Sequence, residues 1–385
     1  MRGARPESAI VGVGESELGV TGCSIYQLQT QAALAALDEA GLCMADVDGL
    51  ATTGVERFSA TAMAEYWGLE PAWVSSTMEG GASFEFMVSD AVDAIRSKRC
   101  DVALISYGSN QRSAAARRLG GVVQAHTPAT QYETPYGVLS PLSLYAMAAQ
   151  RHFHEYGTTS EQLAEIAVAA REWALLNPKA YRYGSGPITV EDVTASPMIS
   201  TPLHRLDCCL VVDGGGAVVL TTLDRARDLP KTPIRVLGCG QSTTHITMSQ
   251  IPDLTRTGAV DSGARAFAEA GLGPDDVDIA EVYDSFTITV LLSLEALGFC
   301  ARGEGGAFVE GGRIRPEGSF PLNTNGGGLS YCHPGMYGVL LLVEAVRQLR
   351  GEAGKRQVPG VEVALAHGTG GILSTHGTVL LGVDR

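Results

Sequence analysis

The sequence has little positive charge and few charged residues overall. Lysine and arginine together number 28, against 42 aspartate and glutamate residues, and only 18% of the residues are charged. The formal net charge is −14. Proteins that bind nucleic acid present a basic face to the phosphate backbone, so this balance argues against a nucleic-acid partner. No apolar run reaches the ~18 residues of a membrane-spanning helix, and we expect no membrane span.

The cysteines form no pairing pattern. The eight Cys residues are scattered without a Cys-x-x-Cys pair, and no cluster has the spacing of metal ligands. We therefore expect reduced thiols, no bound metal and a cytoplasmic protein. The charged N-terminal residues lead directly into an apolar strand, unlike a signal peptide. What the chain does have is 45% hydrophobic residues and 47 glycines, which predict a well-packed globular protein with many tight turns.

The chain also repeats itself. Residues 39–48 and 269–278 both begin Glu-Ala-Gly-Leu and end Asp-Val-Asp, and each segment follows an alanine-rich helical pattern. The glycine just after each helical pattern is the residue expected to end the helix. Two further pairs follow in the same order: 91–96 with 342–347, and 213–220 with 370–381. Three matches in one order indicate a duplicated unit.

Two similar halves with alternating strand and helix patterns predict a mixed α/β fold with pseudo-twofold symmetry. We expect residues 1–235 to form the N-terminal half and residues 236–385 the C-terminal half. A stretch of about 110–205 belongs to neither repeat. It has helical patterning at 142–154 and 160–176. A long insertion over a duplicated core is usually a lid or a binding element.

Several motifs resemble the thiolase superfamily. Residues 323–328 read Asn-Thr-Asn-Gly-Gly-Gly and residues 333–338 read His-Pro-Gly-Met-Tyr-Gly. These two segments together resemble the thiolase motif Asn-x-x-Gly-Gly followed by Gly-His-Pro and a further Gly. The sterol carrier protein x branch is resembled by Leu206-Asp207-Cys208-Cys209, Asp213-Gly214-Gly215-Gly216-Ala217, Asn177-Pro178 and residues 187–193. The resemblance covers nearly the whole chain.

This resemblance implies an α-β-α-β-α layered core, a homodimer, and coenzyme A lying under the insertion as part of the substrate. It implies no other cofactor. Active sites of such enzymes lie where helix N-termini from the two halves meet, and helix N-termini stabilise a developing enolate or oxyanion. The branch also implies a small partner protein with an OB fold and a zinc ribbon, which would give a heterotetramer.

The thiolase nucleophile is missing. A thiolase carries its reactive Cys just before the helix expected at 83–96, but the loop at 78–83 reads Met-Glu-Gly-Gly-Ala-Ser. Without a thiolate there, no acyl-enzyme can form by the usual route. We expect Ser83 to act as a helix N-cap rather than a nucleophile. Gly80 and Gly81 would let the backbone approach a thioester and offer N–H donors.

Two other motifs depart from the thiolase pattern. Tyr283 opens a Tyr-Asp-Ser-Phe segment where many thiolases read Asn-Glu-Ala-Phe, and His367 stands where a second Cys is expected. Tyr283 and Tyr331 together resemble the lipid-transfer-protein-type aldolases of steroid side-chain degradation. Retro-aldol cleavage needs a base for a β-hydroxyl, donors for an enolate and an acid for the α-carbon. The predicted catalytic residues are Tyr283, Tyr331 and His333, and the predicted supporting residues are Asp284, Gly80, Gly81, His367, Gly370 and Asn325.

The favoured interpretation is therefore a carbon–carbon lyase of lipid metabolism. It would split a β-hydroxyacyl-CoA, for which the resemblance suggests a steroid side chain, into a ketone or aldehyde and a shorter acyl-CoA. A second interpretation is an acyltransferase or thiolase with a relocated nucleophile, for which Cys332 is the candidate thiol. A third is a non-catalytic thiolase-like subunit that scaffolds the OB-fold partner.

Overall fold

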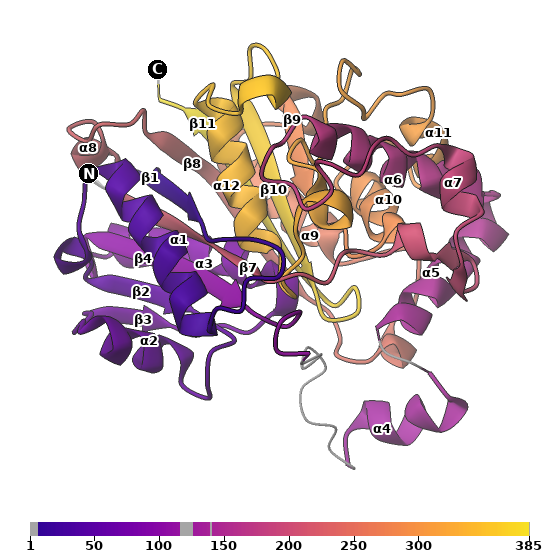
Figure 1. Cartoon of the computed structure of the whole chain (residues 1–385), viewed down its shortest axis with the longest axis horizontal. Helices are drawn as coiled ribbons and strands as arrows, with labels where there is room; N and C mark the ends of the chain where they lie inside the picture. The colour runs from indigo at the N-terminus through magenta and orange to yellow at the C-terminus, as the bar shows by residue number, and fades with distance from the viewer. Residues whose placement is uncertain (1–6, 116–125, 139–140, 385) are drawn as a thin grey trace.

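The computed structural model describes residues 7–115, 126–138 and 141–384 (Figure 1). The expected insertion at about 110–205 therefore lies partly outside the described residues. One large sheet runs through the molecule in the strand order β3-β2-β4-β7-β1-β8-β11-β10-β9. Its strands are β1 (Ser8–Glu15), β2 (Gly49–Thr52), β3 (Trp73–Ser75), β4 (Val102–Ser109), β7 (Gly214–Thr222), β8 (Ile234–Thr243), β9 (Ile279–Val282), β10 (Val363–Gly370) and β11 (Thr375–Val383). A small separate hairpin consists of β5 (Met198–Ser200) and β6 (Leu203–His204).

The two halves of the sheet share one strand order. They meet where β1 pairs antiparallel with β8, with Ala9 opposite Arg235 and Ile10 opposite Ile234. Outward from this seam the order is β1-β7-β4-β2 on one side and β8-β11-β10-β9 on the other. Strand β7 is antiparallel to both of its neighbours, as is β11, and the outer pairs β2–β4 and β9–β10 are parallel. Because β8 begins at Ile234, the second copy starts just before the boundary expected at 236.

The helices complete a layered arrangement around this sheet. They are α1 (Ile25–Ala40), α2 (Ser59–Trp67), α3 (Ser83–Arg96), α4 (Pro128–Tyr132), α5 (Leu142–Tyr156), α6 (Ser160–Leu175), α7 (Val190–Thr194), α8 (Leu223–Ala226), α9 (Ala259–Ala270), α10 (Thr287–Ala296), α11 (Gly305–Val309) and α12 (Gly338–Leu349). Helix α1 covers the outer face of the first half, and α9 covers that of the second. Helices α3 and α12 contact strands of both halves and form the middle layer. The expected mixed α/β class and α-β-α-β-α order are confirmed.

The repeated glycines end the equivalent helices, as the sequence predicted. Gly41 closes α1 with φ 68°, and Gly271 closes α9 with φ 68°. This left-handed conformation is open to glycine at little cost, and it lets the chain leave the helix at once. A short 3₁₀ turn then follows each helix, at Met44–Asp46 and at Pro274–Asp276, and leads into β2 and β9.

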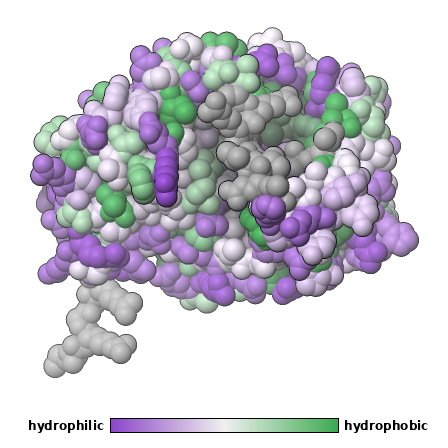
Figure 2. All heavy atoms as spheres, turned by 90° about the horizontal axis from the view of Figure 1, so that it is seen from below, coloured by the Kyte–Doolittle hydropathy of each residue, from purple (hydrophilic) through white to green (hydrophobic). Residues whose placement is uncertain are grey.

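The insertion forms helices at the positions that its pattern predicts. Helices α5 and α6 fill the stretches expected at 142–154 and 160–176, and both pack against α10 of the C-terminal half. They lie with α7 at the right of Figure 1. The face seen from below presents hydrophobic side chains scattered among hydrophilic ones (Figure 2). No helix within the described ranges combines the length and the apolar composition that crossing a membrane requires.

A carboxyl group lies deep in the middle layer. Glu85, in the first turn of α3, is 1% exposed, and neither of its oxygens has a hydrogen-bond partner. Glycines make room for it. A Cβ at Gly338 would lie 2.7 Å from Glu85 Oε2, one at Gly377 would lie 2.6 Å from Glu85 Cβ, and one at Gly368 would overlap Glu85 Oε2. Burial raises the pKa of Glu85 to about 8, so the acid is largely neutral near pH 7.

Replacing Glu85 with glutamine should therefore remove a pH dependence of stability. The folded state holds the Glu85 proton more tightly than the unfolded chain, so this contribution is present below about pH 4.5 and is lost as pH rises toward about 8. The difference in unfolding free energy between wild type and Glu85→Gln should change by ~1.4 kcal/mol per pH unit in that window. Urea unfolding of both proteins near the two ends of the window measures it. An unchanged difference would contradict this account.

Candidate active site

Tyr283 and His333 come together where the two halves meet. Tyr283 directly follows β9, and His333 lies between the π-helical turn η8 (Gly327–Tyr331) and α12. The Tyr283 hydroxyl lies 2.9 Å from His333 Nε2 and 3.5 Å from the carbonyl oxygen of Gly335. The two rings meet edge to face, with centroids 5.6 Å apart. Both side chains are buried, at 4% and 5% exposure, so the pair is held in one geometry.

Burial keeps both members of this pair neutral. Desolvation raises the pKa of Tyr283 well above its ordinary value, and desolvation lowers the pKa of His333 to about 4. Near pH 7 the phenol therefore keeps its proton and the imidazole keeps a lone pair. With Nε2 as the acceptor, Tyr283 donates to His333. Such a pair can accept a proton at the Tyr283 oxygen while the phenolic proton moves to His333.

The loop that lacks the cysteine lies against the Tyr283 ring. It forms a short 3₁₀ turn, η2 (Gly80–Ala82), that runs straight into α3. A Cβ at Gly81 would overlap Cε2 and Cζ of Tyr283 and would lie 2.5 Å from the carbonyl oxygen of Thr369. The Tyr283 ring therefore fills the space that a side chain at this position would need. A nucleophile at residue 81 and a tyrosine at residue 283 exclude each other.

The rest of this loop packs on the end of β10. Gly80 has φ +60°, and a Cβ there would lie 2.9 Å from Cα of Gly370, so the two backbones touch. Ser83 does not act as the expected N-cap. It is the first residue of α3, and its hydroxyl donates to the carbonyl of Gly80 (2.7 Å) and accepts from the N–H of Glu79 (2.8 Å). The hydroxyl closes the loop, and this leaves no base beside it.

Tyr331 lies close to the pair in sequence, but its hydroxyl points elsewhere. It donates to the carboxylate of Glu15, which also binds Lys179 and lies 4.0 Å from Arg347. Glu15 lines a surface cavity of about 550 Å³ between β1 and α1. The Tyr331 and Tyr283 hydroxyls therefore do not form one proton relay, because Tyr331 donates its proton to Glu15 whereas Tyr283 pairs with His333.

Asp284 and Asn325 support the site rather than enter it. Asp284 accepts hydrogen bonds from the N–H groups of Gly328 (2.6 Å) and Leu329 (3.1 Å), and so caps the η8 turn that leads to His333. Burial raises its pKa to about 7. Asn325 Oδ1 accepts from the hydroxyl of Tyr337 at 2.7 Å and from the N–H of Gly327 at 2.8 Å.

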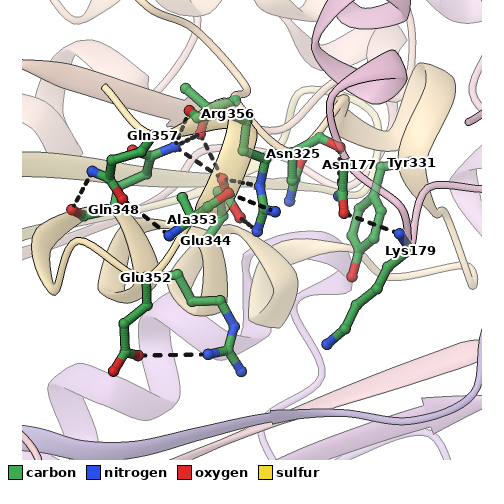
Figure 3. Close-up of polar contacts among 12 residues, drawn as sticks. Asn177, Lys179, Asn325, Tyr331, Glu344, Gln348, Glu352, Ala353, Arg356 and Gln357 are labelled. Carbon is green, nitrogen blue, oxygen red and sulfur yellow. Dashed lines mark hydrogen bonds and ion pairs between the residues drawn. The ribbon is translucent and has the colours of Figure 1, made fainter. Parts of the chain in front are cut away.

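A buried polar network holds the loop that carries Asn325. The hydroxyl of Thr324 lies 2.8 Å from Glu281 and 2.7 Å from Glu344, while Gln348 donates to it at 2.9 Å. One hydroxyl has one proton to give, so one of the two carboxyls must itself be protonated. Glu344 is paired with Arg356 at 2.8 Å, as Figure 3 shows, so Glu281 is the neutral acid. Burial and the charge of Glu344 raise the pKa of Glu281 accordingly.

His367 faces away from the reacting pair. Neighbouring residues of a strand point to opposite faces, and Gly368 faces Glu85 in the middle layer. The His367 side chain therefore points to the outer layer, where Nδ1 lies 2.9 Å from Thr378 Oγ1 and Nε2 lies 3.4 Å from His376. Its backbone does reach the site, because its carbonyl accepts from the N–H of Tyr283 at 2.9 Å. The His367 imidazole therefore does not contact the Tyr283–His333 pair and takes no part in the proton transfer that this pair allows.

Sequence reasoning missed Tyr337 and Cys209. Tyr337 packs edge to face on Tyr283, with centroids 5.9 Å apart, and lies nearly parallel to His333. Tyr337 belongs to the same His-Pro-Gly-Met-Tyr-Gly motif as His333, and this position could have identified it from the sequence as a residue near the site. Cys209 is held beside the Tyr-Asp-Ser-Phe segment by its N–H bond to the carbonyl of Ser285 (3.0 Å). In the described part of the chain, no three His, Cys, Asp or Glu side chains gather as a metal site.

Neither thiol near the site is set up as a nucleophile. Burial raises the pKa of Cys209 above its ordinary value, and burial with the charge of Glu15 does the same for Cys332. The Cys332 sulfur also packs toward Gly214 and the carbonyl of Asp213 rather than toward Tyr283. Because the thiolate is the attacking species, both groups are poorly prepared for acyl transfer.

Gly81→Ala should displace the Tyr283 ring. The new methyl group cannot share the space with the ring, so we expect a loss of ~1–3 kcal/mol in stability from overpacking. Activity should fall ~100-fold or more, because displacements near 1 Å at a reacting group have effects of that size. The matched control is Gly273→Ala, where a Cβ would meet only Asp276 Oδ2 at 3.8 Å. Activity is measured by turnover of an acyl-CoA. Equal activity in the two variants would show that the contact between the Tyr283 ring and Gly81 is not required for catalysis.

Comparison with known proteins places the chain in a family. Residues 240–383 match the family described as "Thiolase C-terminal domain-like". The chain is 38% identical to a steroid side-chain-cleaving aldolase of Thermomonospora curvata, over 98% of both chains. It is 37% identical to the 17-hydroxy-3-oxo-4-pregnene-20-carboxyl-CoA lyase of Mycobacterium tuberculosis, over 97% of this chain and 99% of that one. It is also 37% identical to an acetyl-CoA acetyltransferase of Methanothermobacter thermautotrophicus, over 96% and 98%.

A solved structure gives the same result at the level of the fold. The "Ltp2-ChsH2(DUF35) aldolase" superposes on this chain with a TM-score of 0.90 and 36% identity, over 99% of both chains. The expected thiolase fold is thereby confirmed, and the match extends through the seam, the middle layer and the insertion. The chain belongs to the thiolase superfamily, in the sterol carrier protein x-like branch that includes the steroid side-chain-cleaving aldolases.

Proposed function

We propose that this chain is a thiolase-like aldolase that cleaves a β-hydroxyacyl-CoA to a ketone or aldehyde and a shorter acyl-CoA. The observation that carries the proposal is the neutral Tyr283–His333 pair, which lies on the glycine loop where a thiolase would hold its cysteine. The aldolase and lyase names of the two bacterial relatives support it. Those names also support a steroid side-chain CoA ester as the substrate.

Cleavage would begin at the β-hydroxyl group of the substrate. Tyr283 Oη accepts the hydroxyl proton while its own proton passes to His333 Nε2, 2.9 Å away. The bond between the α- and β-carbons breaks, the β-carbon becomes a carbonyl, and the bonding electrons move into the thioester as an enolate. The proton then returns from His333 through Tyr283 to the α-carbon. The site ends in its starting state, and the proton of the β-hydroxyl ends on the acyl-CoA product.

The enolate oxygen needs donors that do not themselves ionise. The N-terminal end of η2 and α3 supplies backbone N–H groups and the positive end of a helix dipole, close to Tyr283. Glycine at residues 80 and 81 lets this backbone pack directly on the Tyr283 ring and on Gly370, which holds its N–H groups in place beside the phenol. The absence of a side chain thus positions these donors for the enolate and makes room for the phenol.

Acyl transfer is the second candidate, and one observation favours it. A relative that is 37% identical over nearly the whole chain carries the name acetyl-CoA acetyltransferase. Such a reaction needs a thiolate close to the thioester. The raised pKa values of Cys209 and Cys332, both caused mainly by burial, argue against it in this chain.

Tyr283→Phe should remove most turnover and keep the binding of the CoA thioester. The ring and its packing remain while the proton donor is lost, and general acid–base groups typically contribute ~100- to 10,000-fold. Steady-state cleavage and the dissociation constant of the thioester measure the two effects. Tyr26→Phe is the control, since that hydroxyl binds only Glu56 on the surface (2.8 Å). Cys332→Ala should stay active. If Cys332→Ala is inactive while Tyr283→Phe turns over, a cysteine mechanism replaces the aldolase.

We further propose that the chain forms a homodimer and binds a small OB-fold partner. The edge strand β3 of the first half supports the first part, because Val74 on it is 50% exposed and Met78 just beyond it is 55% exposed. An exposed apolar edge strand is a template for pairing with a second chain. The name of the similar solved aldolase pairs Ltp2 with ChsH2(DUF35), and this pairing supports the second part.

Light scattering should then give a particle of at least twice the 40.3 kDa chain mass at micromolar concentration. Val74→Asp should convert this particle to a monomer, because a charge on an edge strand opposes edge-to-edge pairing. Ile246→Asp changes an equally apolar residue that is 76% exposed on the other half, and it should leave the mass unchanged. A wild-type monomer, with or without the partner protein, would disprove the dimer.

A further inference from the structure

Glu85 is a buried acid without a structural partner. Both of its carboxyl oxygens are buried in the middle layer, and neither has a hydrogen-bond partner. An acid buried in this way costs stability, and an apolar side chain of the same size would avoid that cost. Glu281, a second buried neutral acid, differs, because it lies 2.8 Å from the Thr324 hydroxyl and accepts from the N–H of the same residue at 3.1 Å. Glu281 therefore holds a loop in place, and Glu85 does not.

The Glu85 carboxyl lies between the N-terminal ends of two helices. It belongs to the first turn of α3, and it packs on Gly338, the first residue of α12. A Cβ at Gly338 would lie 2.7 Å and 2.9 Å from the two Glu85 oxygens, and it would overlap the carbonyl oxygen of Gly81. The Glu85 carboxyl and the Gly81 peptide therefore meet at one point. The Tyr283 ring rests on the same Gly81 backbone.

The two helix ends give this place a positive electrostatic potential. Helix N-termini carry free N–H groups and the positive end of the helix dipole. In the proposed cleavage, negative charge develops on the enolate oxygen of the thioester beside the N-terminal end of α3. An ionised Glu85 would oppose this charge through a medium of low dielectric, where like charges repel strongly. A neutral Glu85 leaves the potential of both helix ends free to stabilise the enolate.

Among the described residues, no charged side chain shifts the pKa of Glu85 from the elements packed around it. Strands β10 and β11 present Gly368 and Gly377 to the carboxyl, so His367 and His376 point to the outer layer. Other titratable groups on these elements have partners elsewhere: Tyr107 of β4 donates to the carbonyl of Pro334, Glu344 and Arg347 of α12 pair with Arg356 and Glu39, and Cys239 of β8 lies beside Glu269. Glu79, just before η2, is half-buried.

Desolvation raises the pKa of Glu85 to about 8. This value lies well apart from those of the reacting pair, because burial lowers the pKa of His333 to about 4 and raises that of Tyr283 well above its ordinary value. Ionisation of Glu85 therefore falls in a pH range where the Tyr283–His333 pair does not titrate. Strongly shifted acids of this kind gather at functional sites more often than elsewhere.

We infer that Glu85 is a positioning residue for the enolate: its uncharged carboxyl leaves the two helix ends free to stabilise the enolate oxygen, and its ionisation stops cleavage. The inference rests on the proposed function, because it needs negative charge to develop beside Gly81. It also accounts for the glycines at residues 338, 368 and 377, which make room for the acid. The chain thus has an alkaline limit to its activity, set by a residue that acts through the backbone of Gly81.

The test is the pH dependence of cleavage by wild type and Glu85→Gln, since glutamine has nearly the same shape and no charge. In wild type, kcat should follow the neutral fraction of Glu85 and fall ~10-fold between about pH 7 and pH 9. KM should change little, because the negative charge exists only in the transition state. Glu85→Gln should keep kcat level over this range. Glu85→Met, a second uncharged side chain of similar length, should do the same.

Asp90→Asn is the matched control. Asp90 is half-buried on the same helix, and desolvation raises its pKa as well. This variant should keep the wild-type fall in kcat. A level wild-type kcat from about pH 7 to pH 9, or a fall that persists in Glu85→Gln, would overturn the role of Glu85.

A binding measurement separates this inference from the proposed function. The probe is an acyl-CoA analogue with an anionic nitronate group in place of the enolate, which imitates the charge without reacting. Near pH 9, Glu85→Gln should bind it ~10-fold more tightly than wild type, and near pH 6 the two should bind it equally. If the affinities differ in this way but wild type cleaves no β-hydroxyacyl-CoA, the proposed function fails and the role of Glu85 stands. If wild type cleaves the substrate while the two affinities agree at every pH, only the role of Glu85 is disproved.

Discussion

The ring of Tyr283 rests on the bare backbone of Gly81, and much of the site depends on that contact. It fixes the phenol beside His333, and it places the ring directly on the N-terminal end of the middle-layer helix. It also excludes any side chain from the position where a nucleophile would stand. The same steric contact therefore leaves no room for a nucleophilic side chain at residue 81 and holds the Tyr283 hydroxyl where it can exchange a proton with His333.

Neutrality is the second theme of this interior. His333, Tyr283, Glu85 and Glu281 are all titratable and all buried, and burial shifts the pKa of each toward its uncharged form. In a region of low dielectric, neutral donors and acceptors can be held side by side without the cost of burying bare charges. Charged pairs such as Glu344 with Arg356 lie behind the reacting groups and hold the loops in place.

The sequence was sufficient for the features that depend on pattern. The repeat at residues 39–48 and 269–278 predicted two equivalent helix ends, and Gly41 and Gly271 adopt nearly the same backbone angles. The motif positions predicted that Tyr283 and His333 share one site. Two expectations failed to predict side-chain direction. Tyr331 bonds to a residue 316 positions away, and His367 points to the outer face of β10, so both depend on packing that no local motif encodes.

The seam between the halves has a consequence for how the protein is made. Gly80 touches Gly370, and β8 completes its ladder only with β11, which ends at Val383. Almost the entire chain must therefore leave the ribosome before the middle layer can close. Until then, the side of α3 that packs on β8, β10, β11 and α12, including the Glu85 carboxyl, has no cover. Contacts so distant in sequence form late, and the exposed intermediate is prone to aggregation. The C-terminal half, which is made last, therefore has to cover the apolar surface of the N-terminal half.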